Sequence, residues 1–184
     1  MQSFGRSALT APAVKMVTDN ERGTIMSAPP FRGLHHLKLP VSDIDASLDW
    51  YRRALGATHQ PQWDHVNDKG VRFAVIISVP GLEQTIELRW APKAAKAIAG
   101  YDPINFAAAD GDFPAWVEHL DALGVGHSPL FTGQAGQVLI FPDPDGTYLR
   151  ILSLAEGGVQ AIKLKTGMEE LDNPWTAPDI MRHP

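Results

Sequence analysis

The sequence predicts an α+β protein that contains two consecutive copies of a strand–helix–strand–strand–strand unit. Short runs in which apolar and other residues alternate indicate the strands, and two longer runs with apolar residues at helical spacing indicate the helices. The same order of elements starts again near residue 103. With 184 residues, 44% hydrophobic and 20% charged, the chain has a globular composition and room for two small modules that share a core.

The first unit is expected at residues 31–91. Residues 34–41 alternate apolar and other side chains, as a half-buried strand does, and Pro40 falls near the end, where a missing amide is tolerated. Ser42 or Asp43 is then placed to cap a helix. The apolar residues of this helix share one face: Ile44, Leu48, Tyr51 and Leu55.

The remainder of the first unit is expected to be extended. The helix should stop at Gly56, because glycine allows the left-handed backbone that ends many helices. Three strands should follow, at residues 58–66, 71–79 and 85–90. Gly81 supplies the turn between the last two of them. Residues 92–102 are expected to form a linker or a short helix.

The second unit is expected at residues 103–155. Asp110 or Asp112 is placed to cap its helix, and Gly124 to end it. The apolar stripe of this helix consists of Phe113, Trp116, Val117, Leu120 and Leu123. Strands are expected at residues 104–108, 125–131, 137–141 and 148–154.

The two units show an internal repeat. With one residue inserted in the second helix, five positions align: Asp43 with Asp110, Asp45 with Asp112, Gly56 with Gly124, His59 with His127, and Pro61 with Pro129. Each unit alone would leave one face of a curved four-stranded sheet uncovered. Pairing the units is therefore expected to create a core or a ligand cavity.

The two ends of the chain fall outside the repeat. Residues 1–30 are interrupted by charges and lack the apolar core of a signal peptide, so we expect a mobile arm. Residues 156–184 are expected to form a tail in which residues 159–171 pack on the modules and Trp175 acts as an anchor. No stretch approaches the roughly 20 apolar residues of a membrane span, so no membrane partner is expected.

Charge and cysteine content narrow the functional classes. The formal net charge is -5 and the lysines and arginines are scattered, so no nucleic-acid partner is expected. The chain has no cysteine, which excludes disulfides, thiol nucleophiles and thiolate metal sites, and which suits the reducing cytoplasm. Any bound metal must use histidine, carboxylate or water ligands.

Four segments carry a resemblance to a known family. They are residues 34–43 (LHHLKLPVSD), 47–56 (SLDWYRRALG), 86–88 (IEL) and 141–147 (FPDPDGT). From about residue 31 to residue 154, the sequence resembles the vicinal oxygen chelate superfamily of glyoxalases, bleomycin resistance proteins and ring-cleaving dioxygenases. The resemblance implies two βαβββ modules whose mixed sheets curl around a central cavity, a small-molecule ligand and a homodimer. It implies no nucleotide cofactor.

The resemblance also implies where a divalent metal would bind. In this family, one residue from the first strand and one from the last strand of each module hold the ion, which chelates two adjacent substrate oxygens. His36 and Glu87 stand at these positions in the first module and suit zinc, iron, manganese or nickel. Pro103 and Arg150 stand at these positions in the second module. Pro103 has no side-chain atom that could bind a metal, and Arg150 is a permanent cation. The usual metal site is therefore incomplete.

Several other side chains are expected to line the cavity. Arg150 is expected to pair with Glu87 in place of the ion, either as structure or to contact an anionic or carbonyl ligand. His35 should face away from His36 by strand alternation. The candidate ligand-binding residues are Trp63, Trp90, Phe106 and His127.

Three functions follow as hypotheses. The first is a protein that binds or sequesters a small organic ligand without a metal. The second is a metal-dependent lyase, isomerase or dioxygenase, in which His65 or His127 completes the ligand set begun by His36 and Glu87. The third is a metal-free enzyme in which His36 or Glu87 is the base and Arg150 holds a developing oxyanion.

Overall fold

The computed structural model describes residues 28–133, 136–154 and 175. Residues 28–35 contain no helix or strand, and the first strand begins at His36. The arm expected at residues 1–30 lies almost wholly outside the described residues, and the packing expected for residues 159–171 lies wholly outside them.

The elements of the first module follow the predicted order. They are β1 (His36–Val41), α1 (Ile44–Leu55), β2 (Thr58–His59), the 3-10 turn η1 (Pro61–Trp63), β3 (His65–Val66), β4 (Arg72–Ser78) and β5 (Thr85–Trp90). The side chain of Asp43 accepts two hydrogen bonds from first-turn amides of α1, and Gly56 ends the helix with φ at 64°. The strand expected at residues 58–66 is broken by η1, because Pro61 has no amide to continue a strand ladder.

The second module repeats this order after the short helix α2 (Pro92–Ile98). Its elements are β6 (Ile104–Ala108), the 3-10 turn η2 (Asp110–Asp112), α3 (Phe113–Leu123), β7 (Phe131–Gly133), β8 (Gly136–Pro142) and β9 (Tyr148–Ser153). Asp112 stands at the helix cap without a side-chain hydrogen bond, and Gly124 ends α3 in the left-handed region. Of the strand expected at residues 125–131, only Phe131 is extended in a sheet, since Gly126 and Pro129 interrupt the preceding residues.

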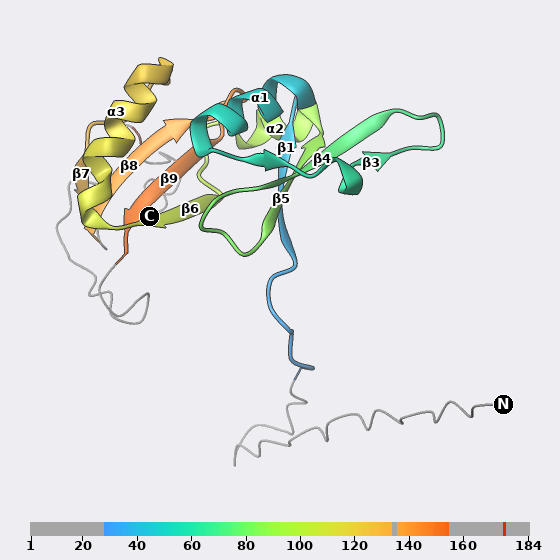
Figure 1. Cartoon of the computed structure of the whole chain (residues 1–184), viewed down its shortest axis with the longest axis horizontal. Coiled ribbons are helices and arrows are strands. Elements are labelled where there is room, and N and C mark those ends of the chain that lie inside the picture. Colours follow the sequence, from blue (N-terminus) through green and yellow to red (C-terminus); the bar gives the residue numbers. More distant parts are fainter. Residues whose placement is uncertain (1–27, 134–135, 155–174, 176–184) are drawn as a thin grey trace, which may run out of the picture. The chain divides into compact units, whose positions relative to one another are not determined.

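Each module forms one mixed sheet. The strand order is β1-β5-β4-β2 in the first, with β3 also paired to β4, and β6-β9-β8-β7 in the second. The first and last strands of each module are parallel, and the other pairs are antiparallel. Figure 1 shows the first sheet in blue to green and the second in yellow to orange. The predicted α+β fold of two βαβββ modules is confirmed.

The two modules share strand register as well as topology. Lys38 lies opposite Glu87 in the β1–β5 pair, and Asn105 lies opposite Arg150 in the β6–β9 pair. Glu87 and Arg150 therefore occupy equivalent places in their sheets, as the family resemblance implies.

One hydrophobic core joins the modules. It contains buried side chains from both sheets and both long helices, among them Tyr51, Val75, Leu88, Phe113, Leu120, Leu139, Phe141 and Ile151. Polar contacts also cross between the modules, including one of 3.1 Å between His119 Nε2 and the Ala54 carbonyl oxygen. The Tyr51 hydroxyl donates to Asp143 Oδ2 at 3.0 Å, and the Ser42 amide donates to Asp145 Oδ2 at 2.9 Å. Removal of the apolar core side chains from water makes the main contribution to the stability of the fold.

A second apolar cluster covers the other face of the second sheet. Leu149 and Ile151 of β9 belong to the shared core, so the alternating Tyr148 and Leu152 face the opposite way. There they pack with Phe131, Val138, Ile140 and Trp175. The rings of Tyr148 and Trp175 lie 5.8 Å apart, so Trp175 itself packs on this face, whereas the rest of the predicted tail lies outside the described residues. Within the described part of the chain, no helix has the length and apolar character needed to cross a membrane.

Candidate functional site

A pocket of about 480 Å³ lies on the first module, beside the start of the parallel pair β1–β5. Its walls combine imidazoles, carboxylates, a hydroxyl and one large aromatic ring. The lining residues are His35, His36, Trp63, His65, Ile76, Glu83, Thr85 and Glu87. We call this the Glu87 pocket. It contains both residues of the first module that the sequence predicts as metal ligands or catalytic groups.

Glu87 is the buried acid of this pocket, with 1% of its surface exposed. Its Oε1 accepts a hydrogen bond from Arg89 Nε at 2.6 Å, and its Oε2 lies 3.3 Å from both Lys38 Nζ and His36 Nε2. Burial alone would raise the pKa of Glu87, but the hydrogen bonds and positive charges of Arg89 and Lys38 outweigh it and hold the pKa below its ordinary value. Glu87 is therefore an ionised and already compensated carboxylate.

Strand geometry explains why these groups meet. Lys38 lies opposite Glu87 in the register, and Arg89 lies two residues further along β5, on the same face. The Arg89 guanidinium stacks 5.1 Å above the ring of Phe73, and its Nη2 lies 3.3 Å from His65 Nδ1. His65 Nδ1 is also 3.9 Å from Glu87 Oε1. Lys38 and Arg89 are not among the residues predicted for the site, although each lies two residues after a predicted one (His36 and Glu87) and so on the same face of its strand.

The prediction that His35 faces away from His36 is wrong. Both rings line the Glu87 pocket, with their Nδ1 atoms 2.8 Å apart and their planes at 78°. Strand alternation does not apply to this pair, because β1 begins only at His36. A chain of polar contacts therefore runs from exposed His35 through His36 to buried Glu87.

The predicted pair between Glu87 and Arg150 is also wrong. Arg150 Nη2 lies 2.7 Å from Asp102 Oδ2, and each of these side chains is 12% exposed. Asp102 directly precedes Pro103, at the start of the strand that pairs with β9, and is thus the nearer acid. Pro103 and Arg150 are not among the residues that line the Glu87 pocket. The four family positions do not converge on one pocket within this chain.

The four predicted ligand-binding residues lie in different places. Trp63 lines the Glu87 pocket and is 54% exposed, whereas Phe106 lines a different pocket. Trp90 is 59% exposed at the end of β5 and lines neither pocket. His127 also lines neither; its ring nitrogens contact the Ser128 carbonyl at 2.7 Å and Asp121 at 3.2 Å. Only Trp63 is therefore placed beside His36 and Glu87.

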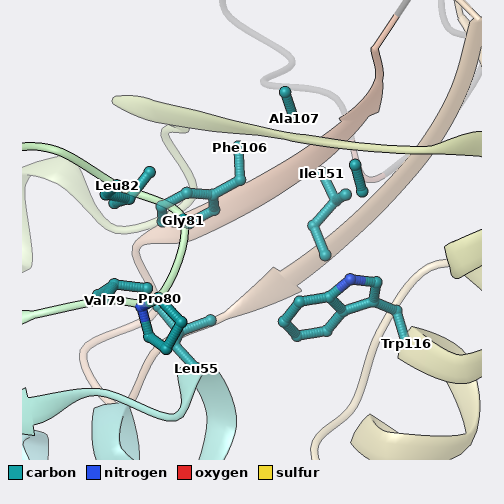
Figure 2. A pocket seen from close by; sticks show the side chains of 10 residues that line it. Leu55, Val79, Pro80, Gly81, Leu82, Phe106, Ala107, Trp116 and Ile151 are labelled. Carbon is teal, nitrogen blue, oxygen red and sulfur yellow. The ribbon is translucent and has the colours of Figure 1, made fainter.

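The second pocket lies between the modules and is apolar. Its volume is about 170 Å³. Figure 2 shows Phe106, Trp116 and Leu55 converging on it from three elements, with the turn at Pro80 and Gly81 alongside. It has the location expected of an inter-module cavity but none of the expected polar groups.

As its side chains are arranged, the Glu87 pocket does not fit a divalent metal. Among the described residues, no group of three or more histidine, aspartate or glutamate side chains is arranged to hold an ion. His36 and His65 flank Glu87, but Arg89 and Lys38 already engage both carboxylate oxygens. A metal would have to displace a guanidinium and approach a second cation.

Comparison with known protein families identifies the fold group. The model of the Glyoxalase/Bleomycin resistance protein/Dioxygenase superfamily matches residues 33–151. The chain belongs to this superfamily. A search of curated proteins gave no match.

Several solved structures share the fold at low sequence identity. TnmS3, an antibiotic binding protein from Streptomyces sp. CB03234, is 20% identical over 70% of this chain and 100% of its own, with a TM-score of 0.56. A glyoxylase/bleomycin resistance protein/dioxygenase domain from Frankia sp. EAN1pec is 22% identical over 70% and 96%, with a TM-score of 0.53. A mutant of the fosfomycin resistance protein FosX from Listeria monocytogenes, complexed with Mn(II) and 1S,2S-dihydroxypropylphosphonic acid, is 15% identical over 67% and 93%, with a TM-score of 0.51.

Proposed function

We propose that this protein binds a small organic molecule in the Glu87 pocket without a metal ion. The observation that carries the proposal is the open pocket whose single buried carboxylate is already compensated by Arg89 and Lys38. Such a carboxylate needs neither an ion nor a ligand cation. The antibiotic binding protein TnmS3 supports the proposal as a neighbour of the same fold.

The lining suggests the kind of ligand. A volume near 480 Å³ suits a molecule of drug size. Trp63 offers an exposed ring face on which a flat apolar group can stack. His35, His65 and Thr85 supply hydrogen-bonding groups for its polar edge. We therefore expect a flat, partly apolar ligand with polar substituents.

Fluorescence titration of metal-free protein with a panel of aromatic acids and polycyclic aromatic antibiotics tests this function. At least one compound should quench tryptophan emission with saturation. Trp63→Ala should abolish that binding, whereas Trp90→Ala, at an equally exposed tryptophan outside the pocket, should retain it. The proposal fails if no compound saturates, or if both variants bind as the wild type does.

A metal-dependent lyase, isomerase or dioxygenase is the second candidate. The Mn(II) complex of FosX in the same fold favours it. His36, His65 and Glu87 would hold the ion, which would polarise substrate oxygens, but only after Arg89 left Glu87. Metal analysis of chelator-free protein should show one equivalent of ion that both His36→Ala and Glu87→Ala lose. A metal-free enzyme with Arg150 as oxyanion holder has less support, because Arg150 contacts Asp102 instead.

A homodimer and a cytoplasmic location stay predictions from the sequence. Light scattering on the purified chain measures the mass in solution directly, and a monomer at micromolar concentration would contradict the first prediction. Cell fractionation would test the second.

A further inference from the structure

We propose that Arg89 excludes divalent metal from the Glu87 pocket, because it occupies the atoms that would otherwise bind the ion. The inference concerns the site of the proposed function and names the residue that makes it independent of metal. It also explains how a chain that keeps His36 and Glu87 can balance the charge of Glu87 without an ion.

Arg89 contacts two atoms of the kind that bind metal ions in proteins. Its Nε lies 2.6 Å from Glu87 Oε1, and its Nη2 lies 3.3 Å from His65 Nδ1. Arginine only donates hydrogen bonds, so His65 Nδ1 accepts in this contact and its lone pair faces the guanidinium. A metal ion would need the same lone pairs, at about 2.0–2.2 Å. One guanidinium thus occupies two potential ligands at once.

Without Arg89, each histidine would lie within reach of an ion that also binds Glu87. His36 Nε2 lies 3.3 Å from one oxygen of Glu87, and His65 Nδ1 lies 3.9 Å from the other. Two ligands with bonds of about 2.1 Å to one ion can be at most about 4.2 Å apart, so each of these pairs is close enough to share an ion. The residue types also suit such an ion, since two imidazoles and a carboxylate form a known facial set.

Arg89 is held in this position from more than one side. The ring of Phe73 lies under its guanidinium, and β5 fixes its backbone between β1 and β4. Lys38 adds a second positive charge at Glu87 Oε2. An ion entering the pocket would meet both cations, and its attraction to Glu87 would be offset by them.

Titration with Mn²⁺, followed by electron paramagnetic resonance of the free ion, tests the inference. The Arg89→Gln variant should bind one equivalent of Mn²⁺ at least tenfold more tightly than the wild type. The gain should disappear when Glu87→Gln is added to it. The matched control is Arg53→Gln, which removes an arginine from the exposed pair with Asp49 and should behave as the wild type does.

A measurement on the wild type keeps the test decisive if Arg89→Gln does not fold. Histidine resonances of the wild type should stay sharp in the presence of millimolar Mn²⁺. Broadening of His36 or His65 that Glu87→Gln abolishes would overturn the inference, as would a folded Arg89→Gln variant that binds Mn²⁺ no more tightly than wild type. Failure of the organic ligand to bind metal-free protein would instead count against the proposed function and leave these results unchanged.

Discussion

Replacing Tyr51 with phenylalanine should measure the contribution of one buried hydrogen bond between the two modules. Tyr51 is fully buried, and the Asp143 carboxylate that it contacts at 3.0 Å is 5% exposed. A hydrogen bond to a charged group contributes about 1.5–3 kcal/mol, and burial of both partners leaves little water to replace it. We therefore expect Tyr51→Phe to lower the free energy of unfolding by about 1.5–3 kcal/mol at pH 7, measured by urea denaturation.

The pH dependence of this loss gives a second check. Burial raises the pKa of Asp143, and the bond from Tyr51 is among the contacts that counteract the rise. Tyr51→Phe should raise that pKa further, so its cost should be larger at pH 7 than at pH 4. The matched control is Tyr101→Phe at a half-exposed ring, with an expected change of less than about 0.5 kcal/mol. A cost below about 0.5 kcal/mol for Tyr51→Phe would refute the reasoning.

Three further substitutions test local features by urea denaturation. Gly136 has φ at 138°, and an added Cβ would lie 2.7 Å from the Cβ of Ser153. Gly136→Ala should therefore lower the free energy of unfolding by more than about 1 kcal/mol. The control is Gly111→Ala, whose added Cβ meets no neighbour and which should change the free energy of unfolding by less than about 0.5 kcal/mol. Asp43→Ala removes the cap of α1 and should cost about 1 kcal/mol. The pKa of Glu87 is lowered in the folded protein, so its ionised form stabilises the fold at any pH above the unfolded pKa of about 4.3. This stabilisation is lost as the pH falls through the folded pKa. The difference in free energy of unfolding between wild type and Glu87→Gln should therefore shrink between pH 7 and pH 3.

The sequence predicts the fold well because its signals are local. Helical spacing and end residues place α1 between Asp43 and Gly56, and the structure agrees with both. The repeat predicts a second module of the same order, and the register of the two parallel strand pairs agrees. The errors occur where proline or glycine breaks an apolar run, as at Pro61, because periodicity is a weak signal over such short stretches.

The site is less predictable because its contacts join residues that are distant in the chain. The sequence identifies His36, Glu87 and Trp63 as candidates, and the structure places all three at one pocket. It does not show which cation reaches Glu87, since that depends on strand register and on which acid is closest to each arginine. Arg150 pairs with Asp102, whereas Glu87 pairs with Arg89.

The placement of Arg89 two residues after Glu87, on one face of β5, can be recognised without a structure. Any chain of this superfamily with arginine or lysine at that spacing from its last-strand glutamate would carry its own positive charge beside the carboxylate. The inference for Arg89 predicts that such chains bind divalent metal weakly, and the tripeptide, here Glu-Leu-Arg, would mark them in the sequence. Overall similarity would not make that distinction, because the same fold accommodates both kinds of chemistry.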